Sequence, residues 1–211
     1  MERILIVGAH YDDAELGAGG TGAKLAALGK EVYKITLTDN RTVSANLGLD
    51  IDTDSSIKES ASACAILGIQ ELEFEPEPCT FLQYSTKLMQ RLEDIIFAKK
   101  IDTVFMHFED DYNQDHVEAN RLCKTAARHC KNLLTYQSNG YVLPTPYYPT
   151  VFSDITAFAD AKLKALKCYE NQHNRFDKLF ETTLDRNKSW GYAHKVGYAE
   201  AFHPIKIDIG L

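Results

Sequence analysis

The sequence lacks the features that define membrane, secreted and nucleic-acid-binding proteins. No part of its 211 residues forms an apolar run approaching the roughly 18 residues of a membrane span. Lysine and arginine form no cluster longer than Lys99-Lys100, and the formal net charge of -7 disfavours binding to nucleic-acid phosphates. The first ten residues read as a strand instead of a signal peptide. We therefore expect a cytoplasmic protein with no membrane span and no nucleic-acid partner.

Cysteine is too scattered in this chain to build a disulfide framework or a thiolate zinc site. The five cysteines are odd in number, and no Cys-x-x-Cys pair occurs. We expect reduced thiols that mostly fill helices or the core. They are Cys64, Cys79, Cys123, Cys130 and Cys168.

The phosphate-binding glycine loops of nucleotide-binding proteins are also absent. A dinucleotide loop needs G-x-G-x-x-G directly after the first strand, but His10 stands there and the glycines at 17, 19, 20 and 22 come about two turns later. No Walker motif occurs. The late glycines fall inside a predicted helix, so we interpret them as sites of close packing between that helix and a sheet.

Apolar strands alternate with helical patterns over the first 140 residues. Continuous apolar strands separated by helices are typical of a parallel sheet covered on both faces, so we predict a doubly wound, mostly parallel α/β fold. Strands are predicted at 3–9, 31–39, 71–75, 102–107 and 133–137, and helices over about 15–28, up to 65–68, over about 84–99 and over about 115–129.

The pattern changes after Gly140. Three prolines mark an irregular segment with an edge strand, and 157–172 reads as an amphipathic helix. The last forty residues, rich in Asn, His, Lys and aromatics, are predicted to fold over the sheet as an appendage at the active-site edge. We thus expect one domain over 1–211, with an α/β core over 1–140 and an edge strand, a helix and a C-terminal segment over 141–211.

Polar side chains follow the first predicted strand, in "IVGAHYDDAELGAGG". Ligands bind such sheets at the carboxyl ends of the strands, where His10 and Asp13 can turn toward one point with Asp12 nearby. This spacing suits two metal ligands and one base. In the alternative interpretation, an aspartate caps the next helix and His10 is an ordinary polar residue.

A second polar cluster follows the strand at 102–107, in "FEDDYNQDHVEANRL". The first and fourth strands are neighbours across the switch point of a doubly wound sheet, so His116 should open into the same crevice as His10 and Asp13. Two histidines and one aspartate form an open site of the catalytic zinc type. No His-Glu-x-x-His, Gly-x-Ser-x-Gly or Pro-Cys-x-x-Cys motif offers another chemistry.

These motifs resemble those of the PIG-L/LmbE-like zinc deacetylases. "AHYDDAELGAGGT" is similar to the family's A-H-P-D-D-x-E motif, "DYNQDHVEAN" to its second motif, and "IKESASACAILGI" and "YAEAF" to runs at matching places. The resemblance implies a Rossmann-like fold with zinc on His10, Asp13 and His116. It also implies that Asp12 is the general base and that the substrate is a small N-acetylated amino sugar or glycoconjugate.

Three positions depart from the family pattern. Tyr11 replaces the usual proline of the first motif, and Ser56 stands where relatives often carry an arginine before Glu59. Asn113 replaces a histidine that in many relatives helps to stabilise the oxyanion. We expect that donor to be either Asn113 or His194, the latter brought over the site by the C-terminal segment.

The remaining polar residues of these motifs receive less specific roles. Glu15 is predicted to orient a ligand or the motif loop, and Asp111 and Asp115 can cap the helix that carries His116. The other histidines are interpreted as structural or surface residues. They are His107, His129, His173 and His203.

Two other functions compete with sugar deacetylation. One is a zinc amidohydrolase for a non-sugar amide or an antibiotic or thiol conjugate. The other is a non-catalytic nucleotide- or sugar-binding module in which Asp39 acts as a ribose ligand, although the missing glycine motif counts against it. The sequence leaves open whether the chain forms a homo-oligomer.

Overall fold

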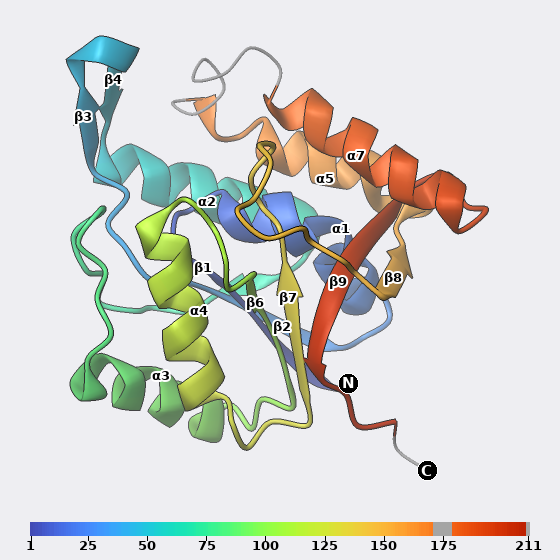
Figure 1. Cartoon of the computed structure of the whole chain (residues 1–211), viewed down its shortest axis with the longest axis horizontal. Helices are drawn as coiled ribbons and strands as arrows, with labels where there is room; N and C mark the ends of the chain where they lie inside the picture. Colours follow the sequence, from blue (N-terminus) through green and yellow to red (C-terminus); the bar gives the residue numbers. More distant parts are fainter. Residues whose placement is uncertain (171–178, 210–211) are drawn as a thin grey trace.

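A seven-stranded sheet forms the centre of the protein (Figure 1). The computed structural model describes residues 1–170 and 179–209. The strand order is β5-β2-β1-β6-β7-β9-β8, and a separate β3–β4 hairpin projects beside it. The strands are β1 (Arg3–Gly8), β2 (Glu31–Thr36), β3 (Thr42–Ser44), β4 (Leu49–Ile51), β5 (Gln70–Glu71), β6 (Thr103–His107), β7 (Asn132–Tyr136), β8 (Val151–Asp154) and β9 (Ala199–Lys206).

Five neighbouring strands, β5, β2, β1, β6 and β7, run parallel, as predicted from their apolar character. Strand β1 pairs with β2 on one side and with β6 on the other, with Ile4 opposite Thr103. The carboxyl ends of β1 and β6 therefore lie side by side at the switch point of the sheet. This confirms the predicted adjacency of the strands that precede the two polar motifs.

Helices cover both faces of the sheet (Figure 1). On one face, α1, α2, α5 and Phe180 of α7 form a hydrophobic core with the sheet. On the other face, α3 and α4 form a second core with it. Both faces of the central strands are thus buried, which explains their continuous apolar sequences. The helices are α1 (Asp13–Ala27), α2 (Thr53–Leu67), α3 (Thr86–Ala98), α4 (Gln114–Ala126), α5 (Ala159–Leu166) and α7 (Leu179–Ala193).

Close packing explains the glycines of α1. A Cβ atom at Gly17 would lie 2.1 Å from the ring of Tyr136, and one at Gly20 would lie 2.8 Å from Ile155. Neither neighbour leaves room for a methyl group. The interpretation as packing positions is confirmed for Gly17 and Gly20, whereas a Cβ atom at Gly19 would have no neighbour closer than 3.6 Å.

The C-terminal segment differs from its prediction. Strand β9 lies within the sheet, antiparallel to both β7 and β8, and is not an appendage folded over it. Phe202 of β9 is buried, and its ring meets that of Phe105 edge-on at 4.8 Å. Since β9 covers the edge of β7, its removal would expose core and unpaired backbone groups.

Two shorter differences concern element lengths. The strand expected at 71–75 is limited to Gln70–Glu71, and the expected helix at 157–172 consists of a 3₁₀ turn (Thr156–Phe158) followed by α5. The end of that expected helix, 171–172, lies outside the described residues. The edge strand expected after Gly140 is β8.

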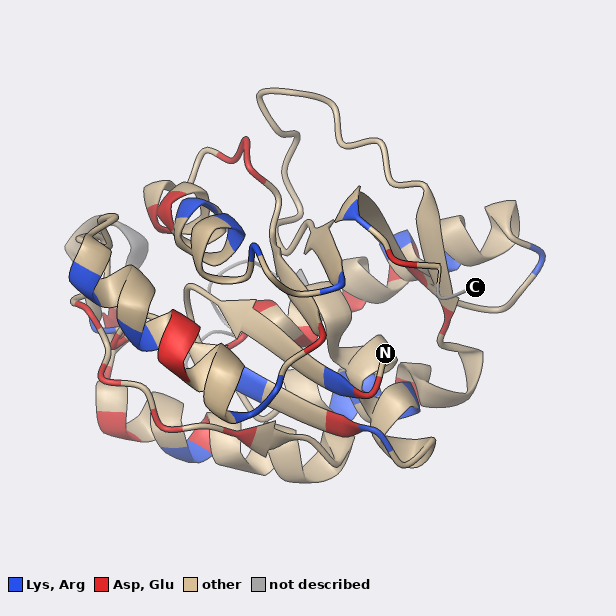
Figure 2. Cartoon of the chain, turned by 90° about the horizontal axis from the view of Figure 1, so that it is seen from below, with Lys and Arg blue, Asp and Glu red and all other residues tan. Residues whose placement is uncertain are grey.

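Figure 2 shows lysine and arginine interspersed with aspartate and glutamate over the helices and strand ends. Within residues 1–170 and 179–209, no helix has both the length and the apolar character needed to cross a bilayer.

Candidate metal centre

The loop after β1 places His10 and Asp13 against each other. The backbone N–H of His10 donates to Oδ2 of Asp13 at 2.8 Å, which closes the loop at the start of α1. The same Oδ2 lies 3.2 Å from Nδ1 of the His10 ring. Asp12 occupies the N-cap position of α1, but its side chain makes no capping hydrogen bond. A helix-cap role therefore does not account for Asp12.

The start of α4 brings His116 to the same point. Asn113 is the N-cap of α4, and its Oδ1 accepts the backbone N–H of Asp115 at 2.9 Å. His116 follows in the first turn, with its Nε2 atom 3.3 Å from Nδ1 of His10 and 3.3 Å from Oδ2 of Asp13. The two polar motifs thus converge on one three-residue group, as predicted.

The outer nitrogen of each histidine faces a carboxylate. Oδ2 of Asp111 lies 2.9 Å from Nδ1 of His116, and Oδ2 of Asp115 lies 3.1 Å from Nε2 of His10. Asp111 and Asp115 were expected as helix caps, and this expectation is wrong because Asn113 caps α4 instead. A carboxylate in this position favours an N–H proton on the outer ring nitrogen, and a neutral ring of this form has its lone pair on the inner nitrogen.

The inner atoms form a group that fits a metal ion. With protons on the outer nitrogens, Nδ1 of His10, Nε2 of His116 and Oδ2 of Asp13 are three acceptors 3.2–3.3 Å apart. Two nitrogen or oxygen ligands of a tetrahedral zinc ion are separated by about 3.4 Å, given metal–ligand distances of about 2.0–2.1 Å. A cation at their centre removes the repulsion among three lone pairs, and carboxylate–histidine pairs of this kind are typical of metal sites.

Electrostatics favours positive charge at this point. Burial opposes charge on His116, but the charge of Asp13 and the hydrogen bonds to Asp111 and Asp13 raise its pKa to about 9. Burial likewise opposes charge on His10, yet Asp115 and Asp13 hold its pKa well above the usual range. Burial would raise the pKa of Asp13, but His116 and His107 keep it well below its usual value. The carboxylates around these rings therefore favour positive charge at this point.

His107 belongs to this centre, although it was interpreted as structural or surface. Its Nε2 atom accepts the backbone N–H of Ala9 at 3.0 Å and lies 3.2 Å from Oδ2 of Asp13. The ring stacks on His116 with centroids 3.9 Å apart. Burial and the nearby His116 lower the pKa of His107 to about 4, so this ring is neutral. His107 is the last residue of β6, and this position at the carboxyl end of a parallel strand could have identified it from the sequence.

The structure does not bring His194 to this group. His194 follows α7, and its ring contacts Phe152 of the edge strand β8 at a tilt of 31°, with centroids 3.6 Å apart. This segment therefore contacts β8 and pairs within the sheet through β9, which differs from the lid that was predicted. Asn113 lies at the start of the helix that carries His116. His129 and His203 contact Phe97 and the backbone of Tyr148, and His173 lies outside the described residues.

Comparison with known proteins supports the resemblance seen in the two motifs. Residues 5–127 match the model of the PIG-L family, described as GlcNAc-PI de-N-acetylase, and this range contains both histidine motifs. The chain belongs to the PIG-L family. It is 30% identical to the uncharacterized deacetylase YaiS of Escherichia coli strain K12 over 177 residues, which are 80% of this chain and 90% of YaiS.

Solved structures show how widely this PIG-L family fold is used. GalB, the 4-carboxy-2-hydroxymuconate hydratase of Pseudomonas putida KT2440, is 22% identical with a TM-score of 0.85, over 100% of this chain and 99% of GalB. The N,N'-diacetylchitobiose deacetylase of Pyrococcus horikoshii is 21% identical with a TM-score of 0.80, over 97% of this chain and 84% of that one. At these identities the likeness shows the fold alone.

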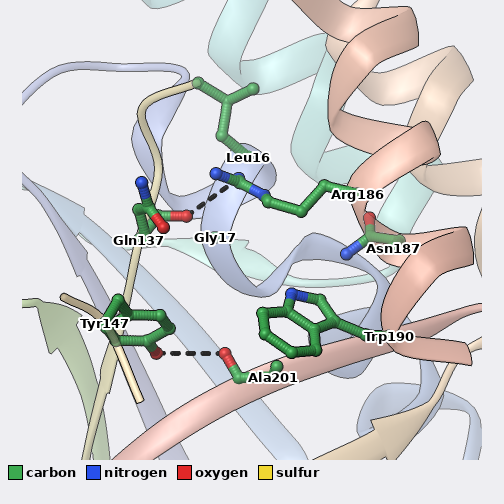
Figure 3. A pocket seen from close by; sticks show the side chains of 8 residues that line it. All are labelled: Leu16, Gly17, Gln137, Tyr147, Arg186, Asn187, Trp190 and Ala201. Carbon is green, nitrogen blue, oxygen red and sulfur yellow. Dashed lines mark hydrogen bonds between the residues drawn. The ribbon is translucent and has the colours of Figure 1, made fainter. Parts of the chain in front are cut away.

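The loop after β7 of this PIG-L family member forms hydrogen bonds to the carboxylate of Asp111. Nδ2 of Asn139 donates to Oδ2 of Asp111 at 2.9 Å, and the Tyr141 hydroxyl donates to Oδ1 at 2.9 Å. Arg186 of α7 in turn donates to the carbonyl of Asn139 at 2.5 Å. It also donates to the carbonyl of Gln137 at 3.0 Å (Figure 3). Helix α7 thus supports the loop behind the centre.

Replacing Asp111 tests this support. Asp111→Asn is expected to weaken metal binding by roughly 10- to 100-fold, because a neutral amide holds the Nδ1 proton of His116 less strongly. Metal affinity would be measured by competition with a chelator of known affinity. The matched control is Asp110→Asn, the neighbouring carboxylate, which pairs with Thr145 instead. Equal affinities for both variants and the unmodified protein would contradict this role of Asp111.

A buried lysine fixes the first motif loop from behind. Nζ of Lys34 donates to the Tyr11 carbonyl at 2.5 Å, to Glu15 at 2.8 Å and to Ser60 at 2.8 Å, and contacts the Tyr169 hydroxyl at 3.0 Å. The side chains of both Lys34 and Glu15 are fully buried. Glu15 therefore orients the motif loop, one of its two predicted roles, through Lys34 and not through direct contact with the centre.

Removal of this lysine should destabilise the fold. Lys34→Met leaves the Glu15 carboxylate buried without its cation, which we expect to lower the free energy of unfolding by about 3–5 kcal/mol. Urea unfolding followed by circular dichroism measures this loss. Lys30→Met is the matched control, since its partner Glu2 is exposed, and should leave the midpoint almost unchanged. A Lys34→Met variant as stable as the unmodified protein would contradict this prediction.

Proposed function

We propose that this protein hydrolyses the acetyl amide of an N-acetylated amino sugar or glycoconjugate, with zinc held by His10, Asp13 and His116. The observation that carries the proposal is the group of three inner acceptor atoms 3.2–3.3 Å apart. Membership of a family described as a GlcNAc-PI de-N-acetylase supports the acetyl amide as the bond that is cleaved.

The chain's own residues supply the proton transfers of this reaction. A bound zinc ion polarises the amide carbonyl and lowers the pKa of water. Asp12, which precedes the ligand Asp13 and makes no capping hydrogen bond to α1, takes the proton of the attacking water and then delivers it to the leaving nitrogen. This transfer releases acetate and a free amine.

Asn113 is the better placed of the two proposed oxyanion donors. Its Oδ1 is used by the cap of α4, so its Nδ2 group is the part that can donate to the oxyanion. We no longer propose His194 for this role because its ring contacts Phe152 of β8 instead. Neutral His107 acts as a positioning residue that contacts the Asp13 carboxylate from the side of β6.

Two tyrosines beside the centre support a sugar as the substrate. Tyr141 donates its hydroxyl to Asp111 and is 44% exposed, while Tyr112 is 69% exposed, and their ring centroids lie 6.2 Å apart. Aromatic faces with polar edges suit a pyranose ring, which has an apolar face and hydroxyls at its rim. The carboxylates around the centre disfavour an anionic substrate at this point.

Other reactions remain as outcomes of the test. The fold also serves a hydratase, so the fold by itself does not select deacetylation. A non-catalytic binding module is disfavoured because Oδ1 of Asp39, its proposed ribose ligand, accepts the backbone N–H groups of Arg41 and Cys79. A non-sugar amide would use the same chemistry as an amino sugar.

A screen for released amine and acetate tests the proposal. Protein purified without chelator would be assayed for metal content and then incubated with N-acetylglucosamine, N,N'-diacetylchitobiose, nucleotide sugars and aliphatic acetamides. We expect one zinc per chain and equal yields of acetate and amine from a sugar. Turnover of aliphatic acetamides alone would replace the sugar with another amide. Zinc-loaded protein that releases acetate from none of them would overturn the proposal.

A further inference from the structure

A cysteine lies against the outer face of the His10 ring. Cys79 is buried, and its Sγ atom lies 4.0 Å from Oδ2 of Asp115, which is itself 3.1 Å from Nε2 of His10. These sulfur, oxygen and nitrogen atoms all lie within 4.8 Å of one another. Cys79 is buried, as expected for a cysteine that fills the core, and it also lies beside two possible metal ligands. Thiolate, imidazole and carboxylate together are a ligand set typical of zinc.

The turn that carries Cys79 is held by the same residues. The backbone N–H of Cys79 donates to Asp39 at 2.9 Å, and that of Thr80 donates to Oδ2 of Asp115 at 2.7 Å. Thr80 has a φ angle of +69°, which is unusual for a β-branched residue. These contacts fix the thiol next to Asp115 and His10, so little ordering is needed for all three to bind one ion.

The separations are close to those of a coordinated ion. In a tetrahedral zinc site, nitrogen and oxygen ligands lie about 3.4 Å apart and sulfur and oxygen ligands about 3.6 Å apart. The present distances are 3.1 Å between His10 and Asp115 and 4.0 Å between Cys79 and Asp115. A movement of about half an ångström would bring the sulfur to the coordinated distance from Asp115, and the sulfur and the His10 nitrogen lie within 4.8 Å of each other.

We propose that Nε2 of His10, Asp115 and Cys79 form a second site, for a thiophilic divalent cation, that competes with the first site for His10. A neutral imidazole has one lone pair, on either Nδ1 or Nε2. When a cation takes the Nε2 lone pair, the ring proton resides on Nδ1, and the thiol proton is released to solvent as the metal–sulfur bond forms. His10 then no longer serves the first site.

Inhibition by excess metal is the consequence. The first equivalent of zinc occupies the site that faces Asp13 and His116, and surplus zinc or cadmium draws His10 to the thiolate side. Only this inhibition rests on the proposed function, because cation binding at Cys79 is measurable without a substrate.

Cadmium reports the second site directly. Full-length protein loaded with one equivalent of zinc would be titrated with Cd²⁺ while the ultraviolet cadmium–thiolate absorption is recorded. We expect this band in the unmodified protein and its loss in Cys79→Ser, because serine has no thiolate to bind the ion. Cys168→Ser, which changes a partly exposed cysteine, is the matched control and should keep the band.

Two further measurements keep the outcome decisive. If Cys79→Ser does not fold, the unmodified protein is used instead. Mass spectrometry then shows whether bound Cd²⁺ protects Cys79 from an alkylating reagent. A band that persists in Cys79→Ser, or unprotected Cys79 at saturating Cd²⁺, overturns the second site. With a substrate in hand, excess zinc should inhibit the unmodified protein more than Cys79→Ser. Absence of any substrate would count against the proposed function and leave the cadmium result valid.

Discussion

Asp12→Asn is expected to retain the metal and to lose between about 10² and 10⁴ in kcat, the range typical of a general acid–base group. Asp12 is only 7% exposed at the start of α1, yet its carboxylate makes no cap to the helix. Asparagine has the same size and still forms hydrogen bonds, but it cannot accept a proton at neutral pH. Steady-state kinetics and metal content would be measured on the same preparation.

The stability of Asp12→Asn separates this role from a structural one. A residue that only supports the helix would change the unfolding midpoint and leave the kcat of the folded fraction intact. We expect the reverse, with a nearly unchanged midpoint and a large fall in kcat. Full activity with reduced stability would show that Asp12 serves the helix and not the reaction.

Asp13→Asn is expected to lose the metal itself. Oδ2 of Asp13 lies within 3.3 Å of the His10, His107 and His116 rings, so it is the anion at the middle of the centre. A neutral amide is a much poorer ligand than a carboxylate, and we expect metal affinity to fall by more than the roughly 10- to 100-fold typical of indirect contacts. Chelator competition measures the affinity, and activity should return only in part at high metal concentration.

The two variants control each other because they make the same chemical change at adjacent positions. If metal content falls for Asp12→Asn and holds for Asp13→Asn, the two roles are exchanged. If neither substitution affects metal content or turnover, the loop is a helix start without a metal site, which was the alternative interpretation of the sequence.

The parallel core could be predicted from the sequence because burial on both faces leaves a local pattern. Strands β1 and β6 are continuous apolar runs, each followed by a helix, and this rhythm is sufficient to predict their adjacency at the switch point. Gly17 and Gly20 of α1 were also interpreted correctly from the sequence. They lie too far along the helix for a phosphate loop, and they face Tyr136 and Ile155.

The placement of the C-terminal strand could not be read from the sequence. Strand β9 pairs with β7 and β8, and Thr135 and His203, which face each other, are far apart along the chain. No local periodicity records which edge a strand will join. The lid interpretation failed because a polar, aromatic segment was taken for a surface feature, whereas its start is buried in the sheet.

The sequence by itself determined the fold class and the candidate ligands His10, Asp13 and His116, because each motif follows a strand whose end is recognisable. Only the tertiary structure decided which carboxylate faces which imidazole, that His107 joins the centre and that Cys79 lies beside His10. His10 and Asp115 are 105 positions apart and meet through side chains from separate loops. Such contacts depend on loop conformations and side-chain directions, and these are fixed by packing rather than by the identity of neighbouring residues.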